Sequence, residues 1–189
     1  MERIIEITEN IITVNKEKYD IIKTNFAAET SNIFITKDKK FIFKKVSDFL
    51  HDKRRNLTLN LSDYNVFERE VHLLKILNEK VNWAPKLICY DSKNKILMSE
   101  FSGERLNKKN KPKNLEDQIK SILNDLEDLN IQHNDIKYNQ EILVLNNKIS
   151  ICDWGWGSIN NHHSCNINLW NGKKPYGITK DKDILKKIK

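Results

Sequence analysis

The sequence predicts a single α+β domain that is rich in strands in its first half and mainly helical in its second. Apolar and polar residues alternate over 33–46, and two apolar runs flank a polar turn over 84–101, as is typical of paired strands. Apolar residues recur at helical spacing over 66–77 and 115–129. With 189 residues, 39% of them hydrophobic, the chain is long enough for one domain with a real core or for two small lobes.

Composition excludes several classes of protein. Charged residues make up 31% of the chain and the mean hydropathy is −0.64, so we expect a soluble protein that does not enter a membrane. The N-terminus is too acidic and too interrupted for a signal peptide. Cys89, Cys152 and Cys165 have no metal or disulfide spacing, which favours a reducing compartment. We expect a cytoplasmic location, or the cytoplasm or nucleus of a host cell if the source is a virus.

Positive charge is concentrated at the C-terminal end. Residues 156–189 contain seven lysines, two aspartates and no glutamate or arginine, so they carry +5 of the formal +7. Such a tail is suited to an acidic protein, an RNA or a phosphorylated substrate, although a solvated C-terminus explains it equally well. Lysine outnumbers arginine 28 to 5, which favours contact with a phosphate backbone over the reading of bases.

The first half of the chain is expected to supply the strands. Paired isoleucines favour strands over 1–24, and the glycine-free segment 26–34 has small residues at Ala28 and Ser31. Residues 33–46 predict a hairpin with its turn at 37–39, in which alternation places Ile42 and Lys44 on one face. Residues 47–63 are polar and predict a loop or a short helix.

Two helices are expected, one on either side of the second strand pair. The helix over 66–77 contains Glu70, with Glu68 as the alternative if the register differs. Strands over 84–91 and 95–101 lead to a basic, proline-containing linker at 108–113. The second helix begins after Asn114 as its N-cap, has a single apolar stripe, and delivers the chain to His133.

Residues 131–155 contain the candidate catalytic and metal-binding side chains of the chain. Two apolar runs joined by Asn146-Asn147-Lys148 predict a hairpin, since asparagine tolerates positive φ. Asp135 lies just before this hairpin and Asp153 just after it, so the two carboxylates are expected to meet at one end. With Lys137 two residues beyond Asp135, the arrangement is suited to a divalent metal and a phosphate.

These residues resemble the catalytic loop and the metal-binding motif of the protein-kinase superfamily, written here as His133-Asn134-Asp135-Ile136-Lys137 and Asp153-Trp154-Gly155. The resemblance covers about 21–155 and includes the small-residue loop, which is more like that of small atypical kinases of the Bud32 type than a glycine-rich loop. It implies a bilobal protein-kinase-like fold within one minimal domain. The β-rich N-lobe would span about 1–101, the hinge and linker 102–113, and a truncated, mainly helical C-lobe 114–189.

The resemblance also implies an ATP site. Ala28 and Ser31 would lie at the phosphates, Lys44 would bind the α- and β-phosphates, and Glu70 would pair with Lys44. With Ser99 as the gatekeeper, the backbone C=O of Glu100 and N–H of Ser102 would meet the adenine edge.

The same resemblance implies the catalytic and metal-binding roles. Asp135 would act as the base or orient the attacking hydroxyl, and Lys137 would neutralise charge on the γ-phosphate. Asp153 and Asn139 would hold Mg²⁺. Because the loop is one residue longer than in the family, Gln140 and Glu141 are alternatives to Asn139. Asp181 or Asp183 would match the aspartate that braces the catalytic loop.

The function implied is an ATP- and Mg²⁺-dependent phosphotransferase, foremost a Ser/Thr protein kinase, because Lys137 follows Asp135 by two residues as in that group. Its partner would be a protein substrate. Three alternatives remain open: a small-molecule kinase, a Bud32-like ATPase that serves RNA modification, and a nucleotide-binding pseudokinase that acts as a scaffold.

Overall fold

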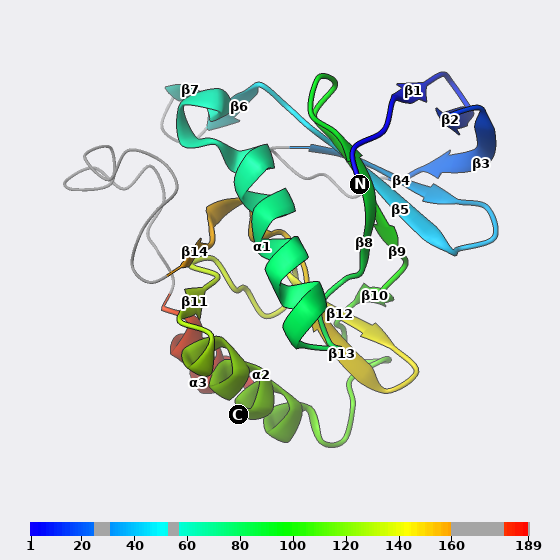
Figure 1. Cartoon of the computed structure of the whole chain (residues 1–189). Coiled ribbons are helices and arrows are strands. Elements are labelled where there is room, and N and C mark those ends of the chain that lie inside the picture. Colours follow the sequence, from blue (N-terminus) through cyan, green and yellow to red (C-terminus); the bar gives the residue numbers. More distant parts are fainter. Residues whose placement is uncertain (25–30, 53–56, 160–179, 189) are drawn as a thin grey trace.

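The computed structural model describes residues 1–24, 31–52, 57–159 and 180–188, and it shows a mixed α/β fold (Figure 1). A large sheet occupies the N-terminal half, α1 lies beside it, and α2 and α3 lie together at the opposite end of the molecule. The predicted α+β class is therefore correct at this level. Ala28 and most of the basic tail lie outside the described residues.

Seven antiparallel strands form the large sheet, in the order β1-β2-β3-β4-β5-β9-β8. The strands predicted over 33–46 and 84–101 are confirmed, and those favoured over 1–24 form a three-stranded meander. The bounds are β1 Ile5–Ile7, β2 Ile11–Val14, β3 Glu17–Lys23, β4 Ser31–Thr36, β5 Phe41–Val46, β8 Leu87–Asp91 and β9 Ile96–Glu100.

The two edges of this sheet approach each other, so that the sheet is nearly closed. Glu2 forms a parallel bridge with Tyr90 of β8. The Arg3 N–H donates to the Tyr90 carbonyl (2.8 Å), and the Tyr90 N–H donates to the Met1 carbonyl (3.2 Å). The closed side encloses an apolar cluster of Ile5, Ile12, Val14, Ile21, Phe34, Phe43, Cys89, Ile96 and Met98.

Helix α1 (Val66–Lys80) buries the predicted apolar stripe, and its position depends on two glycines. A Cβ on Gly155 would collide with Val66, and one on Gly157 would collide with Leu73. These glycines let the turn η2 (Trp154–Trp156) approach the helix closely. The helix is preceded by β6 (Phe49–Asp52), β7 (Leu57–Asn60) and the turn η1 (Leu61–Tyr64), where the sequence predicted only a loop or short helix.

The C-terminal region is built on α2 (Leu115–Asp128), which confirms the second predicted helix. Asn114 precedes it, but its side chain accepts from Gln118 Nε2 (2.8 Å) rather than capping a backbone N–H. The hairpin of β12 (Ile142–Leu145) and β13 (Lys148–Ile151) pairs with β10 (Glu104–Arg105). β11 (Ile131–Gln132) pairs with β14 (Ser158–Ile159), and η4 (Asp181–Ile184) leads into α3 (Leu185–Ile188).

One apolar cluster joins α1 to this C-terminal region. Leu73, Leu74 and Leu77 of α1 pack in it with residues of α2 and of the β12–β13 hairpin. Since α1 also packs against the large sheet through Val66, Phe67 and Val71, it connects the two regions. Across the described ranges, none of the helices is both long and apolar enough to cross a membrane.

Candidate functional site

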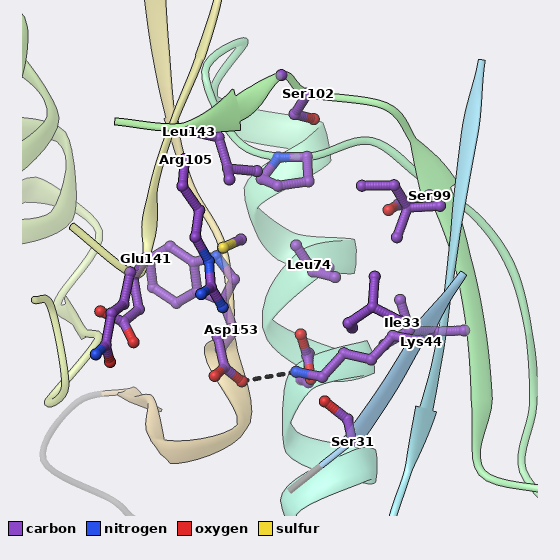
Figure 2. Close-up of a pocket in the computed structure, with 18 of the residues that line it drawn as sticks. Ser31, Ile33, Lys44, Leu74, Ser99, Ser102, Arg105, Glu141, Leu143 and Asp153 are labelled. Atoms are coloured by element: carbon purple, nitrogen blue, oxygen red, sulfur yellow. Dashed lines mark hydrogen bonds and ion pairs between the residues drawn. The ribbon is translucent and has the colours of Figure 1, made fainter. Parts of the chain in front are cut away.

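A pocket lies between the large sheet, α1 and the β12–β13 hairpin (Figure 2). Its walls are mostly apolar, and a few charged groups gather at one end. The apolar lining includes Ile33, Ile35, Ile42, Leu74, Leu97, Leu143 and Trp154; the charged lining residues are Lys44, Glu70, Arg105, Glu141 and Asp153. An apolar cleft with a few convergent polar groups is typical of a small-molecule site.

Lys44 is held between two carboxylates in this pocket. Its ammonium lies 2.6 Å from Glu70 Oε2 and 2.6 Å from Asp153 Oδ1. The Lys44 and Glu70 side chains are 9% and 4% exposed, whereas that of Asp153 is 34% exposed. The Lys44–Glu70 pair expected from the sequence is therefore present, and Glu68, the alternative, is exposed.

Strand register explains why Lys44 faces the pocket. In β5, Lys44 lies opposite Ile33 of β4 and Leu97 of β9, and all three residues line the pocket. Ile42, two residues earlier, lines it too, as the predicted alternation requires. On the facing side, β13 ends at Ile151, and Asp153 adopts a positive φ of 68° where the chain turns into η2.

The pKa values of Lys44, Glu70 and Asp153 depend on one another's charges. Burial alone would lower the pKa of the Lys44 ammonium, but Asp153 and Glu70 raise that pKa well above its usual value. Burial likewise opposes ionisation of Asp153, yet the charge of Lys44 holds the Asp153 pKa below its usual value. Burial raises the pKa of Glu70, against the charge of Lys44.

A second ion pair lies in the loop before β12. Lys137 Nζ donates to Asp135 Oδ2 (2.6 Å), and the Asp135 side chain is 19% exposed. Burial raises the pKa of Asp135 despite the neighbouring Lys137. The pKa of Lys137 is also raised, because Asp135 outweighs the opposing effect of burial.

This loop is held in place by Asp181 and by His133. Asp181 accepts the backbone N–H groups of His133 (2.7 Å) and Asn134 (2.9 Å), so the predicted brace is present and belongs to Asp181. Asp183 instead pairs with Lys186. The His133 ring lies within hydrogen-bond distance of the Cys152 carbonyl (Nε2 to O, 2.8 Å) and packs edge-on against Trp154, whose centroid is 4.6 Å away.

The three candidates for the second metal ligand differ in their position relative to the pocket. Asn139 is exposed and does not line the pocket, whereas Gln140 and Glu141 do. Glu141 is buried, and it accepts the Lys137 N–H through Oε2 (2.8 Å). Burial raises the pKa of Glu141 to about 7. Asn139, the residue favoured from the sequence, therefore does not lie where it would bind an ion in the pocket. It is exposed in the turn over 138–140, whereas Glu141, directly before β12, is buried and lines the pocket.

No ready-made metal centre is present in the part of the chain that the structure describes. There, no three His, Cys, Asp or Glu side chains are grouped so as to hold an ion. Asp153 and Glu141 nevertheless both line the pocket. Mg²⁺ commonly takes only one or two protein carboxylates and completes its shell with water and substrate phosphates, so this donor set fits the ion.

The segment predicted to meet adenine borders the pocket. Ser99, Ser102 and Gly103 line it, while the Glu100 side chain is directed to an exposed ion pair with Lys86 (3.3 Å). Gly103 has a φ of 112°, and a Cβ there would collide with the Val144 carbonyl of β12. Glycine at this position therefore lets the chain pass directly over the hairpin.

At the opposite end, Ser31 lies at the start of β4 close to Lys44 (Figure 2). Its side-chain oxygen is buried and has no hydrogen-bond partner among the residues that the structure describes. Sequence reasoning overlooked Arg105, which also lines the pocket. Its strand, β10, has only two residues, too few for a periodic pattern to reveal it.

The sequence was also compared with known proteins. No family model matches it, and no curated protein does.

Proposed function

We propose that this protein is an ATP- and Mg²⁺-dependent phosphotransferase with a bilobal, protein-kinase-like architecture. The observation that carries the proposal is the ammonium of Lys44, bound by both Glu70 and Asp153 at the end of an apolar pocket. These three residues come from β5, α1 and the turn after β13, so only the folded chain brings them together. A cation fixed in this way is suited to orient a polyphosphate.

In this proposal the apolar and charged parts of the pocket would hold different parts of the nucleotide. Adenine would lie between Ile42 and Leu143, with its edge toward the backbone at Glu100 and Ser102. The phosphates would then extend toward Lys44 and Asp153. An apolar slot that ends in charged groups favours a ligand of this mixed character.

Asp153 and Glu141 would hold Mg²⁺, which when bound supplies positive charge to the phosphates. Asp135 would orient the acceptor hydroxyl and accept its proton, and the raised pKa of this partly buried carboxyl favours proton transfer. Lys137 would stabilise charge on the transferring phosphoryl group. Asp181 keeps both residues in position by fixing the backbone just before them.

The substrate proposed is a serine or threonine hydroxyl of a protein. Lys137 lies 2.6 Å from Asp135, so the carboxylate and the ammonium would approach the same hydroxyl and phosphoryl group. A second candidate, a nucleotide-binding pseudokinase, is favoured by the exposed position of Asn139. In that case the pocket would bind ATP without transferring phosphate.

The test is incubation of the full chain with γ-labelled ATP, Mg²⁺ and a mixture of protein acceptors. We expect incorporation of label that is lost in both Asp135→Asn and Asp153→Asn. Asp20→Asn is the matched control, because its carboxylate is exposed and pairs with Lys37 on the surface. Its incorporation should equal that of the unchanged protein.

Binding measurements on the same proteins separate the two candidates. ATP binding without label transfer would support the pseudokinase, and transfer that survives Asp153→Asn would contradict the assigned site. If the unchanged protein binds no nucleotide at all, the proposed function is wrong.

A further inference from the structure

The charge of the pocket raises a question about how it would accept a polyphosphate. Its described lining holds three carboxylates, Glu70, Glu141 and Asp153, and two cations, Lys44 and Arg105. Lys44 is already bound by two of the carboxylates at 2.6 Å. That trio is net negative, so Lys44 alone offers little attraction to a further anion.

Arg105 is the other cation, and the fold directs it into the same space. In the β10–β12 pair, Arg105 lies directly opposite Leu143, and directly paired residues project from the same face of a sheet. Leu143 lines the pocket, and so does Arg105. Figure 2 shows the Arg105 side chain entering from β10, opposite Lys44, and extending toward the end where Asp153 lies.

We propose that Arg105 is a second phosphate-binding cation of this pocket, beside Lys44, and that it makes the pocket select nucleoside di- and triphosphates over the uncharged nucleoside. The inference rests on the proposed function, since it concerns the same nucleotide. It adds a specificity-determining residue and defines the ligand class by its phosphates.

The chemistry of arginine fits this role better than that of a lysine. A guanidinium carries five N–H donors in a planar fork, so it can bind two phosphate oxygens and still contact a neighbouring protein group. Hydrogen bonds between two charged partners are also stronger than neutral ones. Adenosine offers no charged acceptor, so its affinity should not depend on this residue.

The experiment measures the affinities of adenosine, ADP and ATP by titration calorimetry, in EDTA and then with Mg²⁺. The proteins are the unchanged chain, Arg105→Met, Arg105→Lys and Lys86→Met. Methionine retains much of the length and apolar contact of the arginine stem. Lys86 is the matched control, because it is an exposed cation beside Glu100 that does not line this pocket.

In Arg105→Met we expect the affinity for ADP and ATP to fall about tenfold or more, with that for adenosine unchanged. Arg105→Lys should lie between Arg105→Met and the unchanged protein, and Lys86→Met should match the latter. Circular dichroism and thermal unfolding confirm that each variant folds.

Three results would overturn the inference. The first is an ADP affinity in Arg105→Met equal to that of the unchanged protein. The second is an equal loss for adenosine and ADP, which would assign Arg105 a packing role. The third is an effect of Lys86→Met as large as that of Arg105→Met, which would indicate general surface charge. In all three the unchanged protein still binds nucleotide, so the proposed function stands; if it binds none, both fail.

Discussion

The closure of the large sheet and the pocket both contain carboxylates, and the two regions supply hydrogen-bond donors to them differently. Where the large sheet closes, Asp91 accepts the backbone N–H of Ile5 (2.8 Å) and of Asn94 (2.9 Å), and also the Asn94 amide (2.9 Å). In the pocket, Glu70 and Asp153 share the single ammonium of Lys44. The first carboxylate is thus held by neutral backbone and amide donors, and the second pair by one charge from a distant strand.

This difference separates a structural carboxylate from one suited to function. Burial raises the pKa of Asp91, but its backbone and amide donors more than compensate, so the pKa lies below its usual value. In the pocket, Glu70 has a raised pKa although it touches an ammonium, and Asp153 is partly exposed. A carboxylate held by several neutral donors joins β1 to the turn after β8, whereas carboxylates that share one cation can exchange it for a ligand.

The largest effect is expected from Lys44→Met. Removing the ammonium leaves Glu70 buried without its cation, which should lower the free energy of unfolding by about 3 kcal/mol. Phosphoryl transfer should be lost as well. Urea denaturation and the label-transfer assay measure the two effects.

The double variant Lys44→Met with Glu70→Leu sharpens this comparison. Replacing a buried ion pair by apolar groups is often neutral for stability, so we expect the double variant to recover most of the lost stability but no activity. If the double variant stays as unstable as the single one, the Lys44–Glu70 pair supports the fold as Asp91 does.

A smaller effect is expected from Asp91→Asn at the sheet closure. The amide cannot accept the Ile5 and Asn94 N–H groups as strongly as a carboxylate, so we expect a loss of about 2 kcal/mol at neutral pH. Nucleotide affinity should not change. Because the folded pKa of Asp91 is below the usual 3.8, its stabilisation is present above that pH and disappears as the pH falls through the folded pKa.

Denaturation of Asp91→Asn and the unchanged protein at neutral pH and near pH 3 measures this contribution. The stability difference should narrow on acidification. Asp48→Asn is the control, since that carboxylate is exposed and pairs with Lys95 across the surface. A difference for Asp91→Asn that is the same at both pH values would show that its charge contributes nothing.

The sequence predicted best those features that a local pattern controls. Alternation placed Lys44 on the same face as Ile42, and Lys44 reaches the pocket as expected. For Glu70 the sequence left Glu68 open as an alternative, and the structure places Glu70 on the buried side of α1. Asp135 and Asp153 flank a hairpin that forms as predicted. The face of Lys44 could be predicted because strand alternation determines where its side chain points, and the hairpin because its turn residues and apolar runs are close in sequence.

The remaining features depend on contacts between segments that no local pattern links. The bridge from Glu2 to Tyr90 joins residues far apart in the chain, so the pairs of isoleucines over 1–24 predicted strands but not closure of the sheet. Glu141 lines the pocket and Asn139 does not, because the turn between them leaves the Asn139 side chain exposed. The position of Arg105 is set by the pairing of the two-residue strand β10 with β12, which no pattern within β10 predicts.

The smallest effect is expected from removing residues 1–3, which tests the closure away from the charged groups of the pocket. The shortened chain loses the two backbone hydrogen bonds to Tyr90, and we expect a stability loss of about 1 kcal/mol. It also exposes the edge of β8, so self-association should increase at high concentration, as light scattering can detect. Nucleotide affinity should equal that of the full chain, because no residue of this segment lines the pocket.

The matched control keeps the three residues but changes each of them to alanine, in a chain released from a cleavable tag. Its backbone can still pair with Tyr90, so it should regain both the stability and the monomeric state. If the alanine chain behaves like the shortened one, then the side chains of Met1 to Arg3 hold the sheet closed. The closure would then resemble the pocket, where side chains rather than backbone groups join distant segments.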